Sequence, residues 1–258
     1  MLRPSGWRLS ASQSATPTGR ALVFSQKRLG MLPPDHVRVS QVAKLSLDTM
    51  FSATPRDWHL KRPWDDDQLM NDQLGDCGPA AAVNWLKLMA QVCGRADLRF
   101  TVDDALDAYR KLGWDGTPAT DNGVRLLDIM RLWYTDGIGG MRIDGFYFVG
   151  FLDEDHLATA VELCGPLIVG ASLPIACQNT DTWDDSVATD TREWGGHAFL
   201  YFANSPGMGT CKTWGQAVYQ TPGFISRRWN ECYLPICQQL QPKTGLDWEG
   251  MVEMAEKV

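Results

Sequence analysis

The amino-acid sequence predicts a mixed α+β fold, in which an N-terminal helical half packs on a C-terminal antiparallel β-sheet. Apolar residues recur at helical spacing as far as Cys164, and short β-rich runs bounded by glycine and proline follow from Pro166 onward. Helices first and strands second is an order typical of the α+β class rather than of βαβ alternation. A chain of 258 residues is long enough to bury a substantial core.

A basic arm is expected before this fold. Residues 1–45 are rich in Ser, Thr, Arg, Gly and Pro, and they hold seven basic residues and one acidic residue in a chain of net charge −7. We therefore assign residues 1–50 to an extended basic arm and residues 51–258 to one folded domain. The arm is expected to contact an anionic surface, such as that of a large protein assembly, or its own domain. A disordered leader and a mitochondrial transit peptide are the alternatives.

Four helices are expected in the first half of the domain. The first runs from Gly78 to a stop signal at Gly94, with its apolar residues on one stripe. Thr101 followed by Asp104 is a capping-box start for the second. The last three helices are predicted at Val102–Leu112, Val124–Tyr134 and Asp153–Cys164.

Strands are expected in the second half. Each predicted strand is short and bounded by turn-forming residues, and the segment Asn204–Gly207 reads as the turn of a hairpin. A final amphipathic helix is expected at Leu246–Lys257. The strands are predicted at Pro166–Leu173, His197–Phe202, Thr210–Gly215 and Gly223–Arg227.

The composition argues against several classes of protein. No apolar run approaches the length of a membrane helix, and the arginines at the start are not followed by the apolar segment of a secretory signal. Seven cysteines without a CxxC pair, accompanied by four histidines, predict neither a metal site nor a cofactor. The acidic body argues against nucleic acid as a partner.

Cys77 is the first candidate for chemistry. It stands in the segment Asn71-Asp72-Gln73-Leu74-Gly75-Asp76-Cys77-Gly78-Pro79-Ala80, directly before a predicted helix. Unpaired N–H groups and the helix dipole at such a position favour thiolate over thiol. Pro79 suits the first turn, where a missing N–H costs nothing. Taken alone, a buried structural cysteine is the better explanation.

His197 is the second candidate. It follows two glycines and opens an apolar strand in the segment Glu193-Trp194-Gly195-Gly196-His197-Ala198-Phe199-Leu200. A neutral imidazole there could take a thiol proton and return it to a leaving group. A structural histidine at the start of a strand is the alternative.

Taken together, these segments resemble the papain-like cysteine peptidase superfamily. The cysteine, the later Gly196-His197-Ala198 and the following Trp214-Gly215 stand in that family's order. The stretch from Asp76 to Ala81 also resembles the bacteriocin-leader peptidases. A closer likeness is to uncharacterised papain-like proteins encoded by bacteriophages, with Thr120-Asp121-Asn122-Gly123 as a further shared element. The resemblance covers about residues 65–236.

The resemblance implies roles for particular residues. Cys77 would be the nucleophile, His197 the base, and Asn71, six positions before the cysteine, the oxyanion donor. The indole of Trp214 would shield the hydrogen bond that orients the histidine. A place in the host cytoplasm or in a virion follows from the same likeness.

The third member of the triad departs from the family's pattern. The family's Asn or Asp stands two positions before the tryptophan, where this chain has Lys212. A lysine cannot accept a hydrogen bond from the imidazole. Asn204, on the preceding turn, is a substitute that lies off the motif. Gln73 is an alternative oxyanion donor at another spacing, and Asp76 is expected to cap the helix.

Two functions are compatible with these motifs. One is a cysteine peptidase that hydrolyses a peptide or isopeptide bond in a peptide or protein substrate. The other is a degenerate papain-like protein that serves as a capsid or tail component of a phage virion. A transglutaminase-like acyl transferase would use the same pair. The acidic segment 175–194 before His197 is a lid, a partner surface or a solvated loop.

Overall fold

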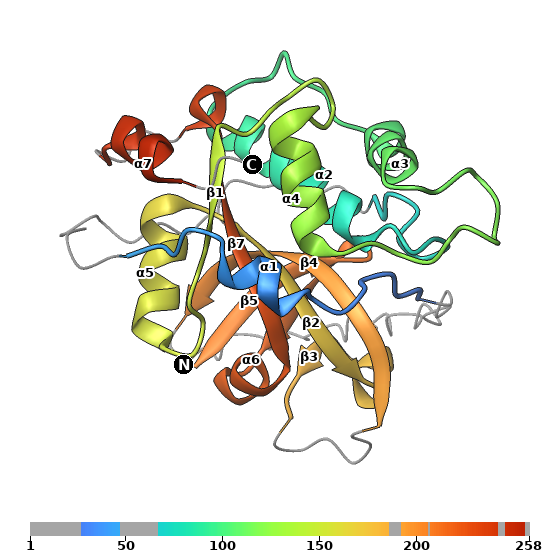
Figure 1. Cartoon of the computed structure of the whole chain (residues 1–258). Helices are drawn as coiled ribbons and strands as arrows, with labels where there is room; N and C mark the ends of the chain where they lie inside the picture. The colour runs from blue at the N-terminus through green and yellow to red at the C-terminus, as the bar shows by residue number, and fades with distance from the viewer. Residues whose placement is uncertain (1–26, 47–66, 186–191, 206, 242–245, 256–258) are drawn as a thin grey trace, which may run out of the picture.

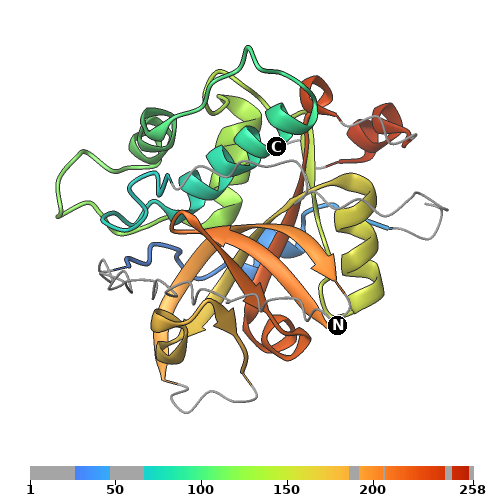
Figure 2. The same cartoon turned by 180° about the vertical axis from the view of Figure 1, so that it is seen from behind.

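The computed structural model describes residues 27–46, 67–185, 192–205, 207–241 and 246–255. A group of helices lies on one side of the molecule, and a seven-stranded sheet lies on the other (Figure 1). The same division is seen from behind in Figure 2. This arrangement confirms the predicted α+β class. No helix in the described ranges combines the length and the apolar character needed to span a bilayer.

The helical half is built around one buried helix. Most of the sixteen residues of α2 are buried, and its Trp85 packs edge-on against Trp133 with ring centroids 5.2 Å apart. The indole of Trp85 also donates to the Pro166 carbonyl at 2.9 Å, which ties the helix to the start of the sheet. The capping box predicted at Thr101 and Asp104 is present. The helices are α2 (Cys77–Val92), α3 (Val102–Lys111) and α4 (Leu126–Thr135).

The sheet has the strand order β1-β7-β2-β4-β5-β6-β3. Its pairs are antiparallel except β3 with β6, which is parallel and departs from the expected all-antiparallel sheet. The central strands β2 and β4 are mostly buried because α2 packs on this part of the sheet. The strands are β1 (Gly145–Phe148), β2 (Leu167–Pro174), β3 (Thr182–Trp183), β4 (Glu193–Ser205), β5 (Met208–Thr213), β6 (Gln216–Gln220) and β7 (Trp229–Ile236).

Smaller elements surround the sheet. Helix α5 packs on β4, and the Tyr147 hydroxyl of β1 donates to the Met251 carbonyl of α7 at 2.6 Å. Asp153 caps α5 as predicted, by accepting from two backbone N–H groups. The elements are α5 (Glu154–Cys164), α6 (Pro222–Arg228), α7 (Trp248–Met254) and two 3₁₀ turns, Ile175–Asn179 and Gln238–Leu240.

The strand predicted at Gly223–Arg227 is wrong. These residues form α6, because Thr221 accepts a hydrogen bond from the Phe224 N–H and Pro222 occupies the first turn. Threonine followed by proline is a helix-start signal that outweighs the local apolar pair. The chain then enters β7, an inner strand of the sheet that the sequence pattern did not indicate.

The described part of the basic arm packs on the folded body. Residues 27–46 run along the boundary between the helices and the sheet, as the blue ribbon of Figure 1, and include the short helix α1 (His36–Ser40). Met31 forms a bridge with Val124, and Lys44 forms one with Phe148. The predicted boundary between residues 50 and 51, and residues 1–26, lie outside the described ranges.

Candidate active site

Cys77 is the first residue of α2, and its side chain is fully buried. Its Sγ accepts a hydrogen bond from the Ala198 N–H at 3.3 Å, so the thiol lies beside the strand that carries His197. Pro79 falls in the first turn of the helix, where no backbone donor is lost. Because the cysteine stands between a loop and a helix, its thiol lies where the first N–H groups of the helix point.

His197 lies on β4, opposite Ala171 of β2, and is also fully buried. Its Nε2 lies 2.6 Å from the hydroxyl oxygen of Thr213. With the proton on Nε2, that nitrogen donates to the hydroxyl and Nδ1 keeps its lone pair. Nδ1 has no hydrogen-bond partner among the described residues. In that tautomer Nδ1 is the nitrogen that can accept a proton.

Trp214 covers the imidazole. The two rings are stacked, with centroids 4.0 Å apart and planes at 11°. Trp214 has φ 48° and Gly215 has φ 72°, and together they form the two-residue turn between Thr213 of β5 and Gln216 of β6. Left-handed backbone at both turn positions suits a tight hairpin, but it strains a residue other than glycine. The hairpin thus holds the indole over the histidine at a conformational cost.

The residue that hydrogen-bonds to the His197 ring is neither Lys212 nor Asn204. The hydrogen-bond partner of His197 Nε2 is Thr213, one position after Lys212. Alternation along β5 turns neighbouring side chains to opposite faces of the sheet, so Lys212 and Thr213 cannot both face the histidine. Lys212 is buried and pairs with Leu200. Asn204 lies near the far end of β4, where its backbone pairs with Gly209.

The loop before Cys77 carries the predicted oxyanion donor. Asn71 is buried, and its Oδ1 has no hydrogen-bond partner among the described residues. Gln73 is exposed. The cap expected from Asp76 is wrong, because its side chain makes no capping hydrogen bond. Its ψ of 21° lies outside the extended conformation that aims an N-cap side chain at the helix.

Asp121, from the predicted middle motif, supports this loop. Its Oδ1 accepts from the Gly75 N–H at 2.8 Å and from the Tyr109 hydroxyl at 2.7 Å. These bonds fix the backbone two residues before Cys77. This motif was identified by its resemblance to the phage-encoded proteins. Its Asp121 therefore positions the backbone before Cys77, a role that the sequence did not reveal.

A segment of the arm crosses the site. We call residues 27–32 the strap. The Met31 N–H donates to the Gly196 carbonyl at 3.1 Å, and the Val124 N–H donates to the Gly30 carbonyl at 2.8 Å. The strap is thus hydrogen-bonded to the sheet on one side and to the start of the α4 segment on the other. A Cβ at Gly30 would lie 2.0 Å from the Gly75 carbonyl oxygen, so only glycine fits at this point.

Two basic residues hold the strap on the acidic body. Arg28 forms an ion pair with the buried carboxylate of Asp121 at 2.7 Å. The Lys27 ammonium lies 4.7 Å from the centre of the Trp214 ring and donates to the Gln178 carbonyl at 3.0 Å. The Trp214 indole in turn donates to the Arg28 carbonyl at 3.4 Å. The arm was expected to contact either an anionic surface of a partner or its own domain. Its described residues contact its own domain.

Burial keeps the Cys77 thiol and the His197 imidazole neutral. Desolvation raises the pKa of the Cys77 thiol to about 12, against opposing backbone hydrogen bonds from Ala198, Gly30 and Gly78. Desolvation, with a smaller effect of the Lys27 charge, lowers the pKa of His197 to about 3. In this arrangement Cys77 is a thiol and His197 a neutral imidazole.

The acidic segment before His197 is partly built into the fold. Trp183 is fully buried against Phe199 and Phe224, and Asp185 forms ion pairs with Arg227 and Arg228 of α6. Residues 182–185 are therefore structural rather than a solvated loop. Residues 186–191 lie outside the described ranges.

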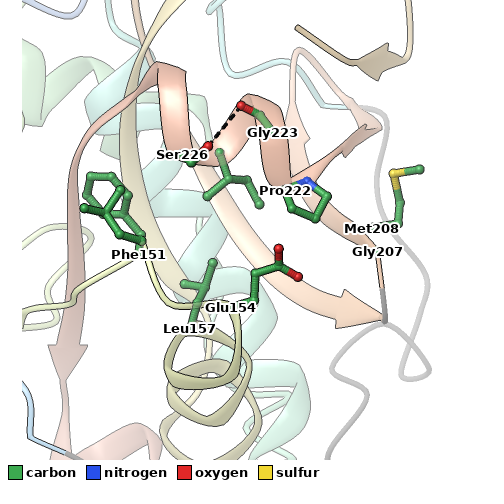
Figure 3. Close-up of a pocket in the computed structure, with 10 residues that line it drawn as sticks. Phe151, Glu154, Leu157, Gly207, Met208, Pro222, Gly223 and Ser226 are labelled. Carbon is green, nitrogen blue, oxygen red and sulfur yellow. Dashed lines mark hydrogen bonds between the residues drawn. The ribbon is translucent and has the colours of Figure 1, made fainter. Parts of the chain in front are cut away.

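A separate cavity lies between α5 and α6. Its volume is about 300 Å³, and its lining includes Phe151, Leu157, Pro222 and Ser226 (Figure 3). None of its lining residues belongs to the Cys77–His197 site.

Solved structures with the same fold are cysteine proteases. Xylellain from Xylella fastidiosa matches with a TM-score of 0.65 at 14% identity, over 83% of this chain and 97% of its own. Procathepsin L 3 from the larval midgut of Tenebrio molitor matches with a TM-score of 0.54 at 13% identity, over 83% and 77%. The Carica candamarcensis cysteine protease CMS1MS2, in complex with E-64, gives 0.50 at 16% identity, over 72% and 99%.

These likenesses confirm that the chain has the papain-like fold. No family model and no curated protein matches the sequence. The three structures are all described as cysteine proteases or their proforms. The expected likeness to phage-encoded and bacteriocin-leader proteins remains a prediction.

Proposed function

We propose that the protein is a papain-like cysteine peptidase, with Cys77 as nucleophile and His197 as base, and that the strap holds it in a latent form. The observation that carries the proposal is the joint placement of the two groups. The thiol at the head of α2 is hydrogen-bonded to the residue after His197, while Thr213 and Trp214 fix the imidazole.

The reaction proposed is hydrolysis of a peptide or isopeptide bond. Proton transfer from Sγ to Nδ1 gives a thiolate, which attacks the carbonyl carbon and forms a C–S bond. Nδ1 then gives its proton to the leaving nitrogen as the C–N bond breaks. Water attacks the thioester, loses a proton to Nδ1 and releases the acid, and the thiol is restored.

The developing oxyanion has two proposed donors. One is the Cys77 N–H, which belongs to the first turn of α2 and has no partner within the helix. The other is the Asn71 side-chain amide, which stands in the buried loop before the cysteine. Donors of this kind stabilise the tetrahedral intermediate more than the substrate.

The strap must leave before this chemistry can begin. Its backbone occupies the hydrogen-bonding groups of Gly196 and Val124 beside the thiol, where a substrate chain would have to bind. Its departure would also readmit water, which lowers the pKa of the thiol and raises that of the imidazole toward their ordinary values.

The test is a strap-opening variant. Gly30→Val places a branched side chain against the Gly75 carbonyl and is expected to displace the strap. Gly150→Ala is the matched control, because its Cβ would meet only the His156 ring at 3.9 Å. We expect Gly30→Val to hydrolyse denatured casein and the control to remain latent. The activity should vanish in Gly30→Val/Cys77→Ala.

If Gly30→Val labels readily at Cys77 but cleaves neither casein nor a mixed peptide library, the peptidase proposal fails. The degenerate scaffold predicted as the alternative would then be the better explanation.

A further inference from the structure

Asp76 is a buried carboxyl group directly before Cys77 in the chain. Its side chain is completely buried. Neither of its two carboxyl oxygens has a hydrogen-bond partner among the described residues. A buried carboxylate without a donor or a cation is costly, whereas a protonated carboxyl group carries no charge. The surroundings of Asp76 therefore favour the acid over its anion.

The groups around Asp76 are negative or neutral. Asp121 and Asp72 both act on it as negative charges. Arg28 of the strap and the Tyr109 hydroxyl of α3 are bound to Asp121 and leave Asp76 without a partner. Burial is the main cause that raises the pKa of Asp76 well above its ordinary value. Its own backbone N–H has a smaller opposite effect, and the two neighbouring carboxylates raise the pKa further.

Asp76 and Cys77 share one helix terminus. Cys77 is the first residue of α2, and Asp76 stands at the N-cap position without making a capping bond. The N-terminus of a helix is equivalent to about half a positive charge, which favours one anion but does not balance two. An ionised Asp76 therefore opposes the Cys77 thiolate. After desolvation, its charge is the other cause that raises the pKa of the Cys77 thiol.

The charge balance of the proposed reaction sets the same limit. Once Cys77 has given its proton to His197, the site holds one cation, the imidazolium, and one anion, the thiolate. If Asp76 is ionised as well, two anions compete for that single cation in a buried site. The state in which Asp76 is ionised and Cys77 keeps its proton is then favoured, and it lacks a nucleophile.

We propose that Asp76 and Cys77 compete for one negative charge at the start of α2, so that Cys77 acts as a nucleophile only while Asp76 keeps its proton. This inference rests on the peptidase function proposed above and adds a regulation of that same site. Asp76 is a positioning residue, because it acts through the protonation state of Cys77. Its ionisation at higher pH returns Cys77 to the thiol.

The first test measures how the thiolate depends on pH. Iodoacetamide labelling of Cys77 is followed from about pH 4 to about pH 9 in Gly30→Val and in Gly30→Val/Asp76→Asn. The amide has the shape of the carboxyl group and cannot ionise. We therefore expect Asp76→Asn to move the midpoint of labelling to lower pH by about one unit or more.

Asp72→Asn in the same Gly30→Val chain is the matched control. It removes a negative charge from the same loop, but Asp72 is partly exposed, so solvent screens its effect on Cys77. A midpoint that does not move in Asp76→Asn would overturn the proposal. Equal shifts in the two variants would overturn it as well, because the effect would then belong to the charge of the whole loop. Asp76→Ser is the second neutral variant if Asp76→Asn does not fold.

The second test detects the proton on Asp76 and needs no catalysis. A protonated carboxyl group has an infrared C=O band that a carboxylate lacks. We expect this band at about pH 7 in the difference spectrum between the native chain and Asp76→Asn, because burial keeps the acid protonated. The difference spectrum between the native chain and Asp72→Asn should not contain it. Absence of the band from the first spectrum would contradict the proposal.

The two proposals fail in different ways. If the band is present and the labelling midpoint shifts in a protein that does not cleave casein, the peptidase function is refuted and the competition between Asp76 and Cys77 stands. If casein is cleaved with the same pH profile in Gly30→Val and Gly30→Val/Asp76→Asn, only the role of Asp76 is refuted.

Discussion

At the scale of single residues, one hydroxyl group decides how the imidazole is held. The sequence pattern directed attention to Lys212 and Asn204, whereas the Nε2 of His197 bonds to Thr213. A hydroxyl can accept from the imidazole and remains neutral when the imidazole becomes charged. It is a weaker support for an imidazolium than a carboxylate would be.

Thr213→Val tests this support. In the strap-open Gly30→Val chain, loss of the hydroxyl should lower kcat/KM by about 10- to 100-fold, because a hydrogen bond to a group that becomes charged is lost. The pH at which Cys77 becomes reactive should also rise, since the imidazolium is less stabilised. Thr210→Val, a buried change on the same strand, is the control. An unchanged pH profile would remove Thr213 from the positioning role.

Glu231 of β7 is buried, and its raised pKa predicts that the stability of the fold depends on pH. Its pKa is about 7 in the folded protein and 4.5 ordinarily, so the folded state binds more protons between these values. The free energy of unfolding therefore falls as the pH rises through this window. Glu231→Gln, which stays neutral, should gain about 3 kcal/mol over the native chain at pH 8 and almost nothing at pH 4.5. Denaturant unfolding at both pH values measures this, and a pH-independent difference would contradict it.

At the scale of elements, the strap and the loop before Cys77 share Asp121. Arg28 is partly exposed, so its ion pair with Asp121 should be worth little to global stability. The Asp121 carboxylate, by contrast, is buried and also holds the Gly75 N–H and the Tyr109 hydroxyl. The two ends of the same ion pair therefore have different roles.

We expect Arg28→Ala to cost less than about 1 kcal/mol of unfolding free energy, yet to speed the labelling of Cys77 by freeing the strap. Asp121→Asn should cost about 3 kcal/mol, because buried charged hydrogen bonds are broken. Chemical denaturation and the labelling rate together separate the two effects. Equal costs for the two variants would show that the loop does not depend on Asp121.

Two helices, α3 and α5, were predicted with the start signals that the structure shows. The capping box at Thr101 and Asp104 and the N-cap at Asp153 both form as expected. The helix α6 was missed because the apolar pair Phe224 and Ile225 outweighed the Thr221-Pro222 start in the sequence pattern. Thr213 was missed because it stands directly before Trp214, whereas the family's Asn or Asp stands two positions before the tryptophan. The tight turn at Trp214 and Gly215 places Thr213, and not Lys212, beside His197.

At the scale of the whole molecule, the order of motifs was enough to predict the papain-like fold. That order fixes which helix carries the cysteine and which strand carries the histidine. The strap was beyond prediction, because the contacts of Gly30 and Met31 depend on surfaces that exist only after both halves have assembled. The close approach of Met31 and Glu231 to Gly170 depends on the pairing of β2 with β7, a strand that the sequence pattern did not indicate.

Cys77 and His197 are proposed to form an activated pair once the strap has left. The most direct test is a pH titration of iodoacetamide labelling at Cys77 in Gly30→Val, located by mass spectrometry against the other cysteines. We expect selective labelling that persists well below pH 7 and is lost in Gly30→Val/His197→Ala. Labelling that follows an ordinary thiol profile, at the same rate with and without His197, would contradict it.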